Sequence, residues 1–242
     1  MCRHLAYAGP AVPLDDLLFD APHSLERQAY APGQMHGGGT VNVDGYGVGW
    51  FPGPVRYRRA GPIWSDANLR QLARTTESTA FLAAVRSATT GMPVVDPACA
   101  PFTDGTWLFS HNGLVSGWPE SVAGLAGTVP VTDLLTMDAP TDSALLWTFV
   151  RRRLEAGGAP ADVLAGLVRE VADAAPASRL NFLLTDGAVI AGTTWTHSLW
   201  VLHDGESVTL ASEPLDGDDA WREIPDRHVV LADPSTVEVR PI

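Results

Sequence analysis

Cys2 is the first residue in the chain whose side chain could act as a nucleophile, and it directly follows Met1. A residue this small after the initiator normally permits removal of the methionine, so we expect Met1 to be removed. The thiol would then share its residue with a free α-amine, whose usual pKa of about 7.7 to 8.0 lets it accept a proton near neutral pH. Cys2 is therefore a candidate nucleophile that carries its own base. The alternative is a small apolar residue at the start of a strand.

A polar tetrapeptide, Ser110-His111-Asn112-Gly113, follows the apolar segment 107–109. Asn-Gly at the end of a strand commonly forms a tight turn. The same two residues can also direct a side-chain amide and a backbone N–H at one oxygen atom, as the donors of an oxyanion hole do. Both interpretations of Asn112 and Gly113 stay open at this point, and by residue type alone His111 is more often structural than catalytic.

Two charged residues stand in segments where each needs a partner. Arg86 ends an apolar run just before the turn Thr89-Thr90-Gly91, so either an internal acid or a ligand carboxylate should lie opposite it. Asp142 follows Thr141 ahead of a helical pattern, where one such residue is expected to cap the helix. Capping accounts for Thr141 or for Asp142 but not for both.

The segment 44–50, Asp-Gly-Tyr-Gly-Val-Gly-Trp, contains three alternating glycines. No helix is expected after the last glycine, so this is not a dinucleotide-binding fingerprint. Glycine at this density instead indicates close approach of the backbone to a neighbouring strand or to a ligand. No metal site is predicted, because Cys2 and His4 share one strand and Cys99 has no partner motif.

Composition excludes several classes of function. The 242 residues include 28 acidic and 16 basic side chains, a net charge of −12, which disfavours nucleic acid and anionic membranes as partners. Every basic residue is an arginine, and the absence of lysine excludes Schiff-base chemistry, lysine-linked pyridoxal phosphate and a Walker phosphate loop. With no membrane-length apolar run and no secretory signal, a cytoplasmic protein is expected.

The elements that must position these residues are mostly short strands. They are too numerous and too closely spaced for a doubly wound parallel sheet, and the simplest packing stacks two sheets with helices outside. We expect a single domain over 1–242, with two small domains as the alternative. The predicted strands are 3–8, 47–51, 55–59, 79–87, 107–111, 180–185, 189–194, 199–203 and 207–211, and the predicted helices are 14–19, 68–74, 143–155 and 161–174.

Taken in chain order, these features resemble the class II glutamine amidotransferases, which have an N-terminal nucleophile. The resemblance rests on Cys2, the loop 44–47, Arg86 with the turn 89–91, His111-Asn112-Gly113 and Thr141-Asp142-Ser143. It implies an α+β fold, a four-layer αββα sandwich of the N-terminal nucleophile hydrolase type. It also implies that neither a cofactor nor a metal is needed.

The resemblance implies a role for each matching residue. Cys2 would attack the γ-carbonyl of a γ-glutamyl amide, and Asn112 with the Gly113 N–H would stabilise the oxyanion before water hydrolyses the thioester. Arg86 would bind the α-carboxylate of the substrate and Asp142 its α-ammonium. The remaining substrate-binding residues implied by the family are Thr89, His111, Gly45 and Tyr46.

Within this family, segments 1–5, 28–32 and 212–228 are similar to the amidohydrolases of ergothioneine biosynthesis. That similarity implies a small-molecule substrate, γ-glutamyl-hercynylcysteine sulfoxide, and simple hydrolysis in place of ammonia transfer. The leaving half carries a trimethylammonium group, for which Tyr30, Trp64 and Trp195 are candidate aromatic partners. Two alternatives stay open: a hydrolase of glutathione or other γ-glutamyl peptides, and a catalytically inactive γ-glutamyl-binding subunit.

Overall fold

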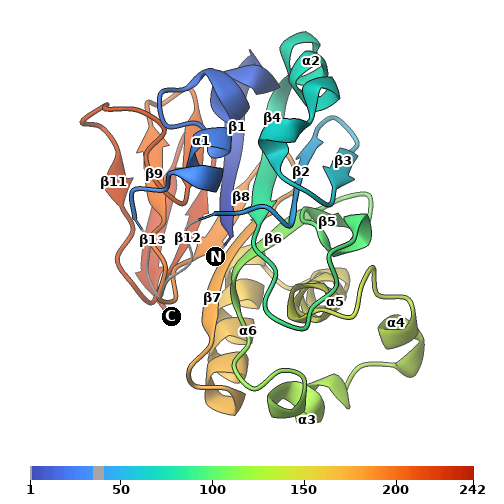
Figure 1. The fold of residues 1–242 in the computed structure, drawn as a ribbon. Helices are drawn as coiled ribbons and strands as arrows, with labels where there is room; N and C mark the ends of the chain where they lie inside the picture. The colour runs from blue at the N-terminus through green and yellow to red at the C-terminus, as the bar shows by residue number, and fades with distance from the viewer. Residues whose placement is uncertain (1, 35–40) are drawn as a thin grey trace.

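Two antiparallel sheets pack face to face in the computed structural model, and helices cover both outer faces (Figure 1). The structure describes residues 2–34 and 41–242, so the expected removal of Met1 concerns a residue outside the described ones. The architecture is the α+β, four-layer αββα sandwich that the family resemblance implies. Within the described ranges, no helix has both the length and the apolar character needed to cross a membrane.

The first sheet has seven strands and contains β1, the strand that follows Cys2. Side chains alternate along β1: Leu5 and Tyr7 pack under the outer helices, whereas Ala6 and Ala8 face the second sheet. The strand order is β11 (Arg222–Glu223), β9 (Trp200–His203), β10 (Val208–Ala211), β1 (Arg3–Pro13), β4 (Glu77–Arg86), β2 (Gly45–Trp50) and β3 (Val55–Arg59).

The second sheet has six strands and contains β6, which carries the polar tetrapeptide. Here Phe109 faces the outer helices, while Leu108 faces the first sheet. The strand order is β13 (Val237–Pro241), β12 (His228–Ala232), β8 (Ile190–Thr193), β7 (Arg179–Thr185), β6 (Leu108–Leu114) and β5 (Phe102–Thr103).

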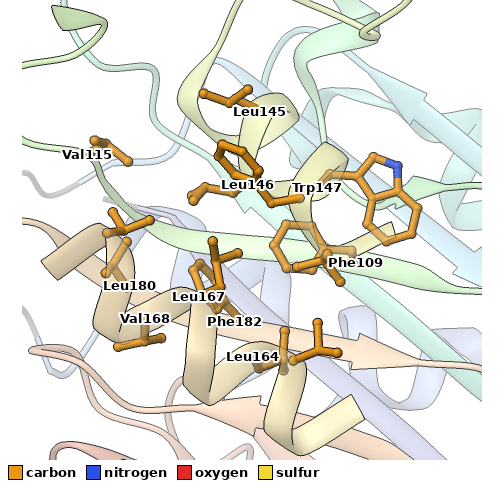
Figure 2. Close-up of a cluster of buried hydrophobic side chains, with 14 of the residues drawn as sticks. Phe109, Val115, Leu145, Leu146, Trp147, Leu164, Leu167, Val168, Leu180 and Phe182 are labelled. Carbon is orange, nitrogen blue, oxygen red and sulfur yellow. The ribbon is translucent and has the colours of Figure 1, made fainter. Parts of the chain in front are cut away.

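Two long helices, α5 (Asp142–Glu155) and α6 (Pro160–Ala174), cover the outer face of the second sheet. Figure 2 shows their apolar side chains meeting those of β6 and β7, with the Trp147 ring stacked on Phe109 at 5.7 Å between centroids. Burial of this surface, at roughly 25 cal/mol per Å² of apolar area, is what holds the helices to the sheet. The first sheet is covered by α1 (Leu25–Tyr30) and α2 (Ala67–Thr75).

Short helical segments fill the connections between these elements. The π-helical segment η1 (Asp16–Asp20) is a shifted version of the helix predicted at 14–19. The others are the 3₁₀ turns η2 (Ile63–Ser65), η3 (Asp96–Ala98) and η4 (Glu120–Val122) and the short helices α3 (Ala123–Ala126) and α4 (Val131–Leu135).

The interior between the two sheets is apolar over most of its extent but polar at one end. Ala6, Leu108 and Leu183 belong to the apolar part. Because side chains alternate along a strand, the buried residues His4 on β1 and Ser110 on β6 lie on the same inner faces, nearer the nucleophile. This polar end is where the candidate catalytic residues gather.

The fold decides between alternatives that local sequence leaves open at two places. Asn112-Gly113 forms no turn, because β6 continues to Leu114 and Asn112 pairs with Asn181 of β7. The glycines of β2 approach the chain itself: a Cβ at Gly47 would lie 2.3 Å from the carbonyl oxygen of Ala100. That strand is glycine-rich because the segment preceding β5 crosses directly over it.

Candidate active site

Cys2 lies immediately before β1, half-buried, and its thiol donates a hydrogen bond to the carbonyl oxygen of Ser87 at 3.9 Å. A narrow cavity opens beside the thiol. Residues from both sheets and from the start of α5 line it, including Cys2, Tyr46, Arg86, Phe102, His111 and Ser143. Four of the residues predicted from the sequence therefore share one cavity.

Asn112 has an environment that the protein alone does not satisfy. Its side chain is fully buried, and within residues 2–34 and 41–242 neither its amide nitrogen nor its amide oxygen has a hydrogen-bond partner. Leaving a buried polar group unpaired costs about 1–3 kcal/mol, so such a group in a native fold needs a partner such as an ordered water or a ligand. This is the state expected of an oxyanion-hole donor before substrate binds.

Position 113 has room for glycine but not for a residue with a side chain. A Cβ at this position would lie 1.8 Å from the carbonyl oxygen of Arg179, closer than any real side chain comes. The glycine lets β6 and β7 pass close together at the position next to Asn112.

His111 links β6 to the start of α5. Its Nε2 lies 2.9 Å from the carbonyl oxygen of Arg179, and its Nδ1 lies 3.0 Å from Ser143 Oγ. A carbonyl can only accept, so we assign the proton to Nε2 and let Nδ1 accept from Ser143. Burial lowers the pKa of His111, against the opposing effect of the Asp142 charge. With both nitrogens engaged, a neutral His111 presents its ring to the cavity.

Arg86 ends β4 and is one of the residues that line the cavity. Its Nη1 donates to the carbonyl oxygen of Pro93 at 2.9 Å. Across the described part of the chain this guanidinium forms no ion pair with a carboxylate, so the internal acid weighed from the sequence is not found. The cation is available to a ligand carboxylate.

Asp142 is the first residue of α5, and the structure separates its role from that of Thr141. Thr141 is the N-cap, because its side chain accepts a hydrogen bond from the N–H of Ala144. The buried Asp142 carboxylate accepts instead from the N–H groups of Val115 (3.0 Å) and Ser143 (2.7 Å). Among the described residues, no arginine forms an ion pair with this carboxylate. The next residue, Ser143, lies in the wall of the Cys2 cavity.

Three other predicted substrate-binding residues differ in position. Thr89 lines a separate hollow of about 460 Å³, together with residues 114–119 and Pro140, and is not in the wall of the Cys2 cavity. Tyr46 does line that cavity, but its hydroxyl donates to Asp66. Gly45 has no room for a side chain, because a Cβ there would clash with the Cys99 sulfur.

A buried ionic network next to Cys2 is not predicted from the sequence. Arg3 donates to the Glu213 carboxylate at 3.0 Å and to the carbonyl oxygen of Cys2 at 3.1 Å. The same carboxylate accepts from the backbone N–H of Gly33 (2.7 Å) and of Gln34 (3.0 Å). Through Arg3, Glu213 therefore connects residues 33 and 34 to Cys2. The only local signal is an arginine beside Cys2 in an otherwise apolar strand.

The charge of Glu213 is stabilised despite its burial. Burial alone raises the pKa of a carboxyl group, but the hydrogen bonds from His23, Gln34 and Gly33, together with the charge of Arg3, bring the pKa of Glu213 below its usual value. The network is thus held together by a carboxylate that remains ionised near neutral pH.

The candidate aromatic partners are in different environments. Trp195 packs at the margin of the core under α5 and α6, and the Arg227 guanidinium lies 5.1 Å from its ring centroid. Tyr30 and Trp64 form an edge-to-face pair at 5.6 Å and are 44% and 40% exposed. Both residues are therefore exposed to solvent.

The environment of the second cysteine disfavours the reactive thiolate form. Cys99 is buried between β2 and η3, and burial raises the pKa of its thiol to about 11. In the described residues, no group of three or more His, Cys, Asp and Glu side chains is placed to hold a metal ion.

The two packed antiparallel sheets with helices on both outer faces, and a cysteine just before β1, define an N-terminal nucleophile fold. Residues 24–204 match the family model of the class-II glutamine amidotransferases, and the chain belongs to this family. The matched range begins after β1, so Cys2 lies outside it.

Curated relatives match along nearly the whole chain. The chain is 41% identical over 246 residues to the gamma-glutamyl-hercynylcysteine sulfoxide hydrolase of Mycolicibacterium smegmatis, a match that covers 100% of both chains. It is also 41% identical over 233 residues to the protein of the same name from Mycobacterium tuberculosis strain CDC 1551, covering 95% of this chain and 92% of the relative.

Solved structures share the fold. A glutamine aminotransferase class-II domain protein from Silicibacter pomeroyi superposes with a TM-score of 0.70 at 24% identity, over 99% of both chains. The glutamine phosphoribosylpyrophosphate amidotransferase of B. subtilis gives a TM-score of 0.71 at 12% identity, covering 99% of this chain and 49% of that one. At these identities the likeness concerns the architecture.

Proposed function

We propose that this chain is a cytoplasmic amidohydrolase that cleaves γ-glutamyl-hercynylcysteine sulfoxide to hercynylcysteine sulfoxide and glutamate in ergothioneine biosynthesis. The single observation that carries the catalytic part is the buried, unpartnered amide of Asn112, on the strand that places His111 in the Cys2 cavity. The substrate is suggested by the relatives of that name, which are 41% identical to this chain.

The proposed first step forms a thioester. After removal of Met1, the α-amine of Cys2 takes the thiol proton, and the thiolate attacks the γ-carbonyl carbon of the substrate. The negative charge that develops on the carbonyl oxygen is stabilised by the Asn112 amide and the Gly113 N–H. The tetrahedral intermediate collapses with cleavage of the C–N bond, and the leaving amine takes the proton from the α-ammonium of Cys2.

The second step releases glutamate. Water, deprotonated by the same α-amine, attacks the thioester carbonyl through an equivalent oxyanion, and the C–S bond breaks to regenerate the thiol. Each turnover consumes one water molecule and needs no redox partner.

Recognition of the γ-glutamyl group is assigned to two opposite charges. Arg86 binds the substrate α-carboxylate, and Asp142 binds the α-ammonium; both side chains lack an ion-pair partner among the described residues. An arginine–carboxylate pair can form two parallel hydrogen bonds, which orients the substrate as well as binding it. Thr89, His111, Gly45 and Tyr46 complete the proposed binding set; of these, the structure brings His111 and Tyr46 to the Cys2 cavity.

Glutamate release by the Met1-processed protein tests the proposal. We expect strong preference for γ-glutamyl-hercynylcysteine sulfoxide over glutathione and glutamine, no turnover by Cys2→Ala, and wild-type turnover by Cys99→Ala. Comparable cleavage of glutathione would instead indicate a hydrolase of γ-glutamyl peptides. Absence of glutamate release from all three substrates would instead indicate a γ-glutamyl-binding subunit.

A further inference from the structure

The two halves of the proposed catalytic machinery lie on different sheets. Cys2 precedes β1 of the first sheet, and Asn112 is on β6 of the second. Backbone hydrogen bonds fix each strand within its own sheet, but the contact between the sheets consists largely of apolar side chains such as Ala6 and Leu108. Apolar contact is not directional. It holds the sheets together without fixing how far one strand lies along the other.

A directional contact crosses this interface close to the site. His4 Nδ1 and Ser110 Oγ form a hydrogen bond of 2.6 Å, and both residues are buried. His4 is two residues beyond Cys2, and Ser110 is two residues before Asn112. Because side chains alternate along strands, each member shares the inner face of its strand with the catalytic residue beside it. The bond therefore joins the strand of the nucleophile to the strand of the oxyanion donor.

The His4 end of this contact is itself rigidly held. The N–H of His4 donates to Ser212 Oγ at 3.0 Å, and the N–H of Ser212 donates to the carbonyl oxygen of His4 at 3.0 Å. Ser198 adds a further hydrogen bond, from its hydroxyl to the carbonyl oxygen of Ser212 at 2.9 Å. These bonds fix the backbone at His4. The hydrogen bond to His4 therefore restrains the position of Ser110.

The contact joins two neutral groups. Burial above all, with the neighbouring positive charge of Arg3 adding to it, holds the pKa of His4 well below its usual value. Burying an imidazole and a hydroxyl costs free energy that only a hydrogen bond offsets. Two apolar side chains would fill the same space without that cost, so packing alone does not account for this pair.

We propose that His4 and Ser110 are positioning residues whose hydrogen bond across the sheets aligns the Cys2 thiol with the Asn112 amide. The inference rests on the proposed function, because alignment matters only if the thiol attacks a carbonyl whose oxygen Asn112 binds. Neither residue is assigned a contact with substrate.

The test compares two reactions of the same thiol in the Met1-processed full-length protein. The glutamine analogue 6-diazo-5-oxo-L-norleucine must bind as a γ-glutamyl group with its carbonyl oxygen at Asn112 before Cys2 is alkylated. Iodoacetamide alkylates the thiol with no such requirement, and peptide mass spectrometry follows its reaction at Cys2. We expect Ser110→Ala to lower the maximal rate of inactivation by the analogue at least tenfold and to change the iodoacetamide rate less than twofold.

Further variants separate alignment from general damage. Ser198→Ala removes a buried hydroxyl from the same chain of contacts without touching the cross-sheet bond, and should keep both rates. His4→Asn, whose side-chain amide reaches about as far as Nδ1, should retain more of the analogue reaction than His4→Leu. Thermal unfolding identifies the folded variants, and the rates of those variants are compared.

The outcomes are distinguishable from failure of the proposed function. An unchanged analogue rate in folded Ser110→Ala and His4→Leu, or equal loss of both rates, would overturn the alignment role. Wild-type protein that reacts with the analogue but releases no glutamate from γ-glutamyl-hercynylcysteine sulfoxide would refute the proposed substrate and leave the alignment role standing. Wild-type protein inert to the analogue would overturn both.

Discussion

Asn112 and Asn181 are direct cross-strand partners on β6 and β7, both fully buried, yet the fold satisfies only one of their amides. The Asn181 side chain accepts from the N–H groups of Trp195 (2.8 Å) and His197 (3.2 Å), and donates to the carbonyl oxygens of His197 (2.8 Å) and Ser198 (3.4 Å). The Asn112 side chain has no partner within the described residues. One amide thus organises a loop, and the other is left for a ligand.

The two asparagines therefore predict opposite effects of the same substitution. Asn112→Ala should reduce kcat about 10²- to 10³-fold, as loss of an oxyanion donor does, with little loss of stability. Asn181→Ala should destabilise the protein by about 2–4 kcal/mol, because it leaves several buried backbone groups unpaired. Steady-state kinetics and urea unfolding of both variants measure this. A stable Asn181→Ala variant with the larger loss of kcat would contradict the assignment.

Arg86 is expected to act in binding. Arg86→Ala should raise KM for the γ-glutamyl substrate about 10- to 100-fold, since hydrogen bonds to charged groups contribute about 1.5–3 kcal/mol. Arg86→Lys should recover part of this, because an ammonium supplies the charge without the bidentate geometry. Arg74→Ala is the matched control: that side chain is exposed and pairs with Asp15. Unchanged kinetics in Arg86→Ala would remove Arg86 from the site.

Elements with strong local signals could be predicted closely. The helix expected at 143–155 is α5, Asp142–Glu155, because its apolar period, its capping threonine and the following glycines all agree. By contrast, α1 was not predicted, although Ser24 caps it with a side-chain bond to the N–H of Arg27. The hairpin of β12 and β13 was also missed, despite its alternating valines and the Asp-Pro turn between them. In both cases a usable signal was present in the sequence.

The rest of the site depends on contacts that no local pattern encodes. Asn-Gly favours a turn when only neighbours are considered, but pairing of Asn112 with Asn181, far along the chain, continues the strand. Glu213 meets Arg3 and Gly33 only after β10 has been placed beside β1. Residue types and chain order predict Cys2, Arg86 and Asn112 as site residues, but not the groups that hold them in place.

Glu213 gives a prediction for pH-dependent stability. Its pKa is lower in the folded protein than the value of about 4.3 expected in the unfolded chain. A lowered folded pKa means that the carboxylate stabilises the fold fully above pH 4.3, and that this contribution is lost as pH falls through the folded pKa. Glu213→Gln should therefore cost about 3–5 kcal/mol at pH 7, the usual penalty for breaking a buried ion pair.

The difference in unfolding free energy between wild type and Glu213→Gln should shrink as pH falls from 5 toward 3, because the carboxyl of the unfolded wild-type chain takes up a proton below about pH 4.3. Urea unfolding at several pH values measures it. Glu170→Gln removes a carboxylate from an exposed pair with Arg153 and should cost no more than about 1 kcal/mol at pH 7. A difference for Glu213→Gln that stays constant from pH 7 to 3 would contradict the assigned charge.

We expect the aromatic pair Tyr30–Trp64 to bind the trimethylammonium of the leaving group. A trimethylammonium over an accessible ring gains about 0.5–2 kcal/mol, so Trp64→Leu should raise KM for γ-glutamyl-hercynylcysteine sulfoxide about 2- to 30-fold. Glutathione lacks that cation, and its KM should not change. Trp195→Leu is the matched control, because Arg227 already covers that indole. Equal effects of Trp64→Leu on both substrates would show that Trp64 acts through packing and not through the cation.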